Sequence, residues 1–112
     1  MKYIVAIIQP GRLTAVHEAL VGIGIEGLTA TEVQGYGRQK GKSEMYRGAE
    51  YSVDTLPKIR LDILIVDENL DHVTDVLLKS AATGKIGDGK IFVTTIDDVI
   101  RIRTGETGSE AI

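Results

Sequence analysis

The stretch KIRLDILI, residues 58–65, decides the fold because its side chains alternate in character along the chain. Successive side chains of a β-strand point to opposite faces of a sheet, so this alternation predicts a strand with one buried face. The aliphatic face consists of Ile59, Leu61, Ile63 and Ile65. The opposite face consists of Lys58, Arg60, Asp62 and Leu64. We expect Lys58 and Asp62 on this second face to be solvated.

Two strands and a helix are predicted before this stretch. Residues 3–8 form a short apolar, β-branched run that is typical of a buried central strand and stops before Pro10. Apolar residues then recur at helical spacing until Gly22. The apolar face of this helix consists of Leu13, Val16, Leu20 and Ile23. Residues 29–36 alternate again and are rich in β-forming residues, which predicts a second strand.

A second helix and one or two strands are predicted after it. Asp67, Asn69 or both are expected to cap the helix. Its apolar face consists of Leu70, Val73, Leu77 and Ala81. Residues 90–95 predict a further strand, and residues 99–103 predict a short last one. The polar tail from Thr104 is expected to be mobile.

The resulting order, β-α-β-loop-β-α-β, predicts an α+β fold of the ferredoxin-like β-α-β-β-α-β type. The 112 residues favour one domain. The two helices would cover one face of the sheet, and association into an oligomer is the simplest way to cover the other. Residues 37–55 would be a long loop between the second and third strands. Compact domains rarely keep a loop of this length without a function.

Composition narrows the class of protein. The chain has no cysteine, which excludes a disulfide scaffold and a cysteine-ligated zinc site and fits a reducing cytosol. Its longest aliphatic runs are far too short to span a bilayer, and no secretory cleavage site follows the start. A net charge of −3 argues against general affinity for nucleic acid.

The segment GYGRQKGKS, residues 35–43, nearly matches two phosphate-binding motifs. A P-loop needs glycine where Tyr36 stands, and the dinucleotide motif needs glycine where Lys40 stands. Both motifs also open a helix, and no helical pattern follows here. We reject both, which leaves a weaker anion site formed by backbone N–H groups with Arg38 and Lys40. A flexible solvated loop is the alternative.

Two further clusters could bind anions. Residues 83–90, TGKIGDGK, combine three glycines with two lysines directly after a helix. Glycine lets a ligand approach the backbone and lysine supplies a point charge for phosphate, although an ordinary turn is the alternative. Arg101 and Arg103 would lie on one face of the last strand, where an anion could join them. A charged edge strand that resists aggregation is the alternative there.

Catalysis has little support in the sequence. His17 and His72 are isolated on predicted helix surfaces, and neither suggests a metal site or a catalytic triad. The sequence has no close pair of carboxylates in an obvious acid–base arrangement, no nucleophile elbow and no cysteine. Anion or nucleotide binding is the better supported class.

Four motifs in the same order resemble the PII nitrogen-regulatory signal proteins. They are YRGAEY at 46–51, TGKIGDGKIFV at 83–93, GYGRQKG at 35–41 and RIRTGE at 101–106. The resemblance covers essentially the whole chain without a gap. It implies a cytoplasmic homotrimer of ferredoxin-like subunits that is not an enzyme and binds ATP or ADP in clefts between subunits.

The resemblance also implies which residues bind the ligands. A nucleotide would contact Thr29, Gly37, Arg38, Gln39, Asp62, Leu64, Gly87, Asp88, Gly89, Lys90, Arg101, Ile102 and Arg103. Gln39 would hold Mg²⁺ beside ATP. The effector 2-oxoglutarate would bind Gln39, Lys40, Gly41 and Lys58. A dianion suits a lysine, backbone donors and a cation, and oxygen-rich Mg²⁺ suits phosphate and keto acid together.

Partners are implied in the same way. Residues 37–55 would be the mobile T-loop, residues 82–90 the nucleotide-binding B-loop and residues 102–112 the C-terminal loop. Family partners include ammonium transporters, a uridylyltransferase, and nitrogen-signalling kinases or adenylyltransferases, and a transporter would bring the protein to the membrane. Arg47 would enter the transporter channel, and Tyr51 would be the residue that a nucleotidyltransferase modifies. A bulky anionic group on Tyr51 would block docking.

Some positions depart from the family pattern. Gln9 replaces a common lysine and Gly11 a bulky apolar residue. Asp62 replaces a frequent glutamate and Leu64 the usual valine, while Ala49 removes the serine that cyanobacterial members phosphorylate. The loss of charge at Gln9 could change nucleotide affinity.

Three other classes of protein are alternatives to the regulatory protein. A small nucleotide-using enzyme, such as a slow ATPase, would need a general base or nucleophile beside residues 87–90, and the sequence offers none. An RNA binder would need exposed aromatic residues on the sheet, and the predicted strands offer only Tyr3, Tyr36 and Phe92. A PII-like nucleotide sensor without the 2-oxoglutarate response is opposed by the presence of Gln39 and Lys58.

Overall fold

The computed structural model describes residues 1–36, 43–46, 49–52 and 55–112, with side chains for 1–36 and 55–112. Four strands form one antiparallel sheet in the order β2-β5-β1-β6. Their bounds are Lys2–Ile8 for β1, Leu28–Tyr36 for β2, Thr55–Ile65 for β5 and Lys90–Thr95 for β6. The predicted α+β, ferredoxin-like arrangement is confirmed, with the first strand lying between the third and fourth strands of the motif.

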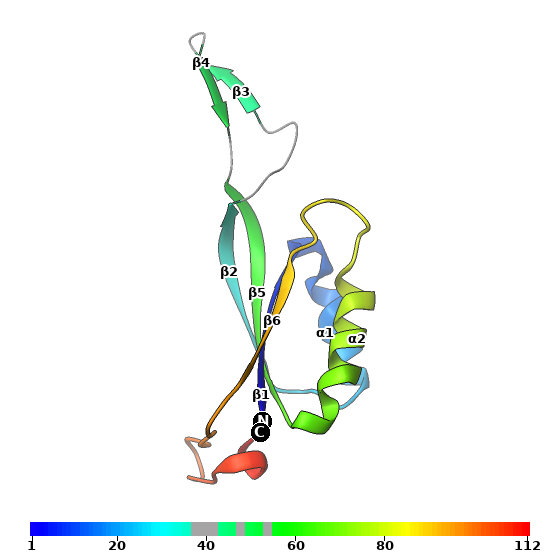
Figure 1. Cartoon of the computed structure of the whole chain (residues 1–112), viewed down its shortest axis with the longest axis vertical. Helices are drawn as coiled ribbons and strands as arrows, with labels where there is room; N and C mark the ends of the chain where they lie inside the picture. Colours follow the sequence, from blue (N-terminus) through cyan, green and yellow to red (C-terminus); the bar gives the residue numbers. More distant parts are fainter. Residues whose placement is uncertain (37–42, 47–48, 53–54) are drawn as a thin grey trace.

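Two helices pack side by side on one face of this sheet (Figure 1). They are α1, Leu13–Gly22, and α2, Leu70–Ala81. Each follows a single 3₁₀ turn, η1 at Pro10–Arg12 and η2 at Asp67–Asn69. No helix among the described residues is long and apolar enough to cross a membrane.

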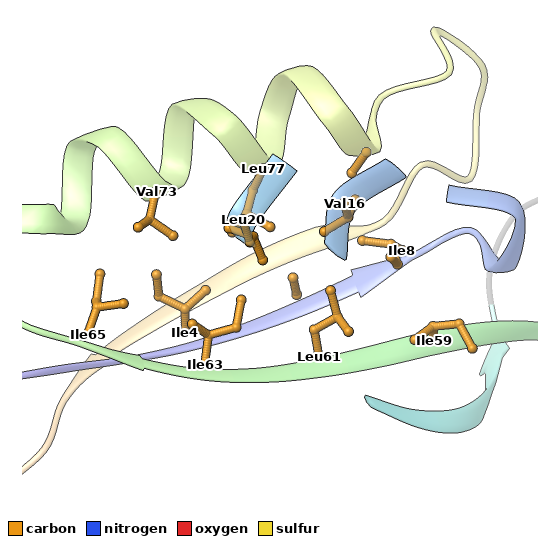
Figure 2. Packing of buried hydrophobic residues seen from close by; sticks show 12 residues of the cluster. Ile4, Ile8, Val16, Leu20, Ile59, Leu61, Ile63, Ile65, Val73 and Leu77 are labelled. Atoms are coloured by element: carbon orange, nitrogen blue, oxygen red, sulfur yellow. The ribbon is translucent and has the colours of Figure 1, made fainter. Parts of the chain in front are cut away.

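The core lies between the helices and the aliphatic face of β5, as the alternation in residues 58–65 predicts (Figure 2). Ile63 of β5 is fully buried and pairs with Ile4 on β1 and with Leu28 on β2. The helices contribute buried residues at the predicted spacing, namely Val16, Leu20, Val73, Leu77 and Ala81. This packing fixes β5 in the centre of the fold.

Several local predictions are wrong. Asn69 is the N-cap residue of α2, but its backbone is helical and no side chain caps the helix. The reason is the η2 turn, which carries the chain into α2, while Asp67 pairs with the N-terminal amine at 2.9 Å. The last predicted strand does not form, because only one bridge joins Ile100 to Thr107. In the tail, Gly108–Ala111 form the 3₁₀ turn η3, and the expected mobility of the tail stays a prediction.

The long connection between β2 and β5 also contains regular structure. Strands β3, Ser43–Tyr46, and β4, Ala49–Ser52, pair antiparallel as a separate two-stranded sheet. Their sequence lacks the apolar alternation from which core strands are recognised, so only the backbone ladder identifies them.

Candidate functional site

The segment between α2 and β6 is a glycine-rich turn that its own aspartate holds. Gly84, Gly87 and Gly89 have positive φ values of 80°, 103° and 95°, which glycine adopts without strain. The Asp88 carboxylate accepts hydrogen bonds from the backbone N–H groups of Thr83 at 2.8 Å and Gly84 at 3.0 Å, and from the Thr83 hydroxyl. These hydrogen bonds hold the pKa of Asp88 below its usual value, and the bond from the Thr83 hydroxyl contributes most. Asp88 therefore shapes the turn and stays ionised.

The same turn lies directly against the end of β1. A Cβ atom added at Gly89 would lie 1.7 Å from the backbone oxygen of Ile7. A Cβ added at Gly84 would meet nothing within 4 Å. Gly89 is therefore required by a close approach between two backbones, in addition to its positive φ.

Lys58 anchors the turn to β5. It is the only buried charged residue among the described residues, with 8% of its surface exposed. Its ammonium donates to the carbonyl oxygen of Gly87, which also accepts a hydrogen bond from Gln9 Nε2 at 2.8 Å. The expectation that Lys58 is solvated is wrong, because its stem packs over Gly35, where a Cβ atom would lie 3.0 Å from Lys58 Cγ.

The ammonium of Lys58 forms no ion pair with any side chain that the structure describes. The Asp88 carboxylate acts on it only at longer range, since Lys58 is the last of the causes that lower the pKa of Asp88. A buried charge needs a charged or strongly polar partner, and a single neutral carbonyl compensates it only in part. The arrangement therefore favours an incoming anion.

Lys58 and the turn line a cavity of about 490 Å³. The cavity lies between the turn and the ends of β2 and β5, and its lining also includes Tyr36 and Phe92. Four residues predicted to bind phosphate, Gly87, Asp88, Gly89 and Lys90, lie here together with the predicted effector ligand Lys58. The structure thus brings one half of the predicted site together. We call this the turn cavity.

The other described half of the predicted nucleotide site lies elsewhere. Thr29 pairs with Asp62 across β2 and β5, and both line a second cavity of about 690 Å³ with Leu64. Tyr3, residues 24–28 and the chain end at Ala111 and Ile112 complete its lining. We call this the base cavity.

The two cavities lie at opposite ends of β5. Lys58 borders one and Asp62 the other, and four residues of extended strand separate them by about 13 Å. The two predicted halves are therefore separate cavities within one copy of the chain.

The two arginines after β6 differ in their surroundings. Arg101 pairs with Glu106 at 3.2 Å and donates to the backbone oxygens of Glu110 and Ile112. Arg103 makes no hydrogen bond to a described side chain, and Ile102 between them is fully exposed. The prediction that Arg101 and Arg103 share one face relied on a strand, and no strand forms at these residues.

Several predicted site residues lie outside the described residues. These are Gly37, Arg38, Gln39, Lys40, Gly41 and Arg47. Tyr51 is described in its backbone alone, which lies in β4 and pairs with Glu44.

Three contacts at the cavities were not predicted from the sequence. Gln9 donates to the turn, Gly35 makes room for the Lys58 stem, and Tyr3 donates to the Asp62 carboxylate. A glycine inside an alternating strand is the one available signal, because it suggests a close approach. Gln9 is marked in the sequence only as a departure from the family pattern, and nothing marks Tyr3, because its partner is distant along the chain.

The described residues do not resemble a catalytic or metal centre. They contain no group of three or more histidine and acidic side chains that could hold a metal ion. What they offer is a buried cation, a glycine turn and two cavities, which suit binding.

The sequence profile described as "Nitrogen regulatory protein P-II" matches residues 1–106 of the chain. The chain belongs to this family. It is 59% identical to "Nitrogen regulatory protein GlnK" of Escherichia coli over 112 residues, which are 100% of both chains. It is 57% identical to "Nitrogen regulatory protein P-II" of Rhizobium etli and 55% identical to that of Pasteurella multocida, each over 100% of both chains.

Membership confirms the resemblance drawn from the four motifs. The P-II relatives are named as regulatory proteins, so the chain is a nitrogen-regulatory signalling protein and not an enzyme.

Proposed function

We propose that this chain senses nucleotide and carbon status by binding ATP or ADP together with 2-oxoglutarate, and that it controls partner proteins accordingly. The observation that carries the proposal is the buried side chain of Lys58, whose ammonium donates to the glycine turn and forms no ion pair with a described carboxylate. Asp88 acts on it only at longer range. A dianionic effector would supply a negative charge in direct contact.

The turn suits phosphate for independent reasons. Its glycines leave the backbone accessible, and Lys90 adds a positive charge at the end of the turn. Asp88 is occupied by hydrogen bonds within the turn. In this proposal Asp88 shapes the phosphate site, while Gly87, Gly89 and Lys90 contact the phosphates.

A homotrimer would complete the nucleotide site. The base cavity of one copy would receive the nucleoside, and the turn cavity of a neighbouring copy would receive the phosphates. The separation of the two cavities along β5 supports this division. Half-exposed Phe92 lies beside Val5 on the sheet face that the helices leave open, which gives that face an apolar surface for a neighbour.

The remaining ligand roles follow the family pattern. Arg101, Ile102 and Arg103 would approach the phosphates, together with residues 37 and 38. Gln39 would hold Mg²⁺ beside ATP, and Lys40 and Gly41 would help Lys58 to bind 2-oxoglutarate. Mg²⁺ would supply a bridge between phosphate and keto-acid oxygens, which are the hard ligands it prefers.

Control of partners would pass through the T-loop, residues 37–55. Different ligand sets would favour different loop conformations and so different partners. Arg47 would contact an ammonium transporter, and a nucleotidyltransferase would modify Tyr51. The protein would act in the cytoplasm and reach the membrane through the transporter.

Calorimetric titration of 2-oxoglutarate into the purified protein tests the proposal. We expect binding in the presence of Mg-ATP and none in the presence of ADP. Nucleotide binding without any effector binding would leave a nucleotide sensor and remove the carbon-sensing role. Absence of nucleotide binding would refute the whole proposal.

A further inference from the structure

A three-residue network lies on the sheet face opposite the helices, at the base cavity. Tyr3 of β1 donates its hydroxyl hydrogen to Oδ1 of Asp62 on β5. Arg60 donates to the same Oδ1 at 3.3 Å and to the Tyr3 hydroxyl oxygen at 3.2 Å. Tyr3 pairs with Leu64 and Asp62 pairs with Val5, so Tyr3 and Asp62 are diagonal neighbours on the same face of the sheet, two residue pairs apart.

Both donors bind the same oxygen of the carboxylate. Oδ2 of Asp62 accepts no hydrogen bond from any described residue. Asp62 is only 26% exposed, so the hydration of Oδ2 is restricted. The Tyr3 hydroxyl, and Arg60 after it, hold the pKa of Asp62 below its usual value, which keeps the carboxylate charged. A charged oxygen that lacks a partner in a partly closed site favours a donor on a ligand.

The walls of the base cavity, to which Asp62 belongs, indicate the chemistry of that ligand. Tyr3, Asp62, Thr29 and Leu64 line the base cavity together with apolar side chains from residues 25 and 28. Thr29 lies opposite Asp62 in the register and adds a hydroxyl. A flat, largely apolar group that carries an O–H or N–H donor fits these walls, as a nucleoside does.

We infer that Tyr3 is a positioning residue, which holds Oδ1 of Asp62 so that Oδ2 receives a hydroxyl or amino hydrogen of the bound nucleoside. The inference rests on the proposed function, because it assigns the base cavity to the nucleoside end of the ligand. Aspartate is one methylene shorter than glutamate, so its carboxylate has fewer orientations, and the tyrosine selects one of them. Tyr3 itself need not contact the ligand.

Calorimetry with three probes tests this role in the full-length protein. The probes are ADP, inosine diphosphate, which lacks the exocyclic amine, and 2′,3′-dideoxy-ADP, which lacks both sugar hydroxyls. Tyr3→Phe keeps the ring in the sheet and removes only the hydroxyl. We expect Tyr3→Phe to weaken ADP binding about tenfold, because the Asp62 carboxylate would no longer be held in one orientation for its hydrogen bond to the ligand. For the analogue that lacks the donor to Oδ2, Tyr3→Phe should weaken binding less than twofold.

A double-mutant cycle separates positioning from general structural support. In an Asp62→Asn background, Tyr3→Phe should change ADP affinity by less than twofold. A further tenfold loss in that background would overturn the inference, because Tyr3 would then act without Asp62. Equal losses for all three probes would also overturn it, since a misfolded cavity weakens every ligand alike.

The wild-type titration keeps the two levels of argument apart. If wild type binds ADP and Tyr3→Phe binds it equally well, the inference fails and the proposed function stands. If wild type binds none of the three probes, the proposed function fails and the inference fails with it.

Discussion

Replacing Gly89 by alanine should damage the protein far more than the same change at Gly84. Both residues have positive φ values in one turn, 95° and 80°, so both substitutions carry a backbone cost of about 1–2 kcal/mol. The two sites differ in their surroundings. The new Cβ would lie 1.7 Å from Ile7 O at Gly89 and would meet nothing within 4 Å at Gly84.

The magnitude follows from how far the backbones must separate. Real Cβ atoms essentially never approach another heavy atom closer than 3.0 Å, so the turn and β1 must part by about 1.3 Å. Overpacking of this kind costs about 1–3 kcal/mol. We therefore expect a loss of about 1–2 kcal/mol in the free energy of unfolding for Gly84→Ala and about 2–5 kcal/mol for Gly89→Ala.

Denaturant unfolding at one fixed protein concentration measures this difference, since association would otherwise shift the midpoint. ADP calorimetry on the same samples reports the turn directly. Gly89→Ala should bind at least tenfold more weakly, because the turn must move away from β1, whereas Gly84→Ala should change binding little. Equal losses of stability in the two variants would refute the close approach between Gly89 and Ile7.

Three further outcomes are expected. Lys58→Met should abolish 2-oxoglutarate binding by calorimetry and change the free energy of unfolding by no more than about 1 kcal/mol, because removing the charge also removes its burial cost; retained effector binding would contradict this role. Gly35→Ala should press on the Lys58 stem and weaken effector binding severalfold with nucleotide binding unchanged, and an equal loss for both ligands would point to a distorted sheet instead. Asp88→Asn should lower stability at neutral pH: the folded-state pKa of Asp88 lies below its usual value of about 3.9, so its contribution is present above that pH and is lost as pH falls through the folded-state value. The difference between wild type and Asp88→Asn in urea unfolding should therefore close in acid, and a gap that persists there would contradict the sign.

The sheet and helices could be predicted because they follow from a periodic burial pattern. Alternation over residues 58–65, the apolar run of β1 and helical spacing in α1 and α2 are local signals, and the core in the structure consists of residues from these segments. The prediction of a last strand was wrong because it, too, relied on a local pattern alone. The alternation of arginine and isoleucine at 100–103 is typical of a strand, but within the described part of the chain it forms only the single bridge from Ile100 to Thr107, and Arg101 contacts Glu106 and Glu110 instead.

The binding site was predictable in its residue types but not in its arrangement. Glycines and lysines in one segment indicate an anion site, and Gly87 and Lys90 do line a cavity. The burial of Lys58 could not be read from the alternation, because that pattern says which face a side chain lies on and not what covers it. The covering comes from a turn far along the chain, which the Gln9 amide helps to hold.

The length of β5 has a genetic consequence. Because Thr29 belongs to the base cavity and Gly89 to the turn cavity, substitutions at the two positions would disable opposite halves of the proposed site. Trimers built from either variant alone would have no working site. In a ring of three that contains both variants, one junction always joins an intact base cavity to an intact turn. Co-expression of two inactive alleles should therefore restore one nucleotide site per mixed trimer, whichever variant supplies two of the three chains.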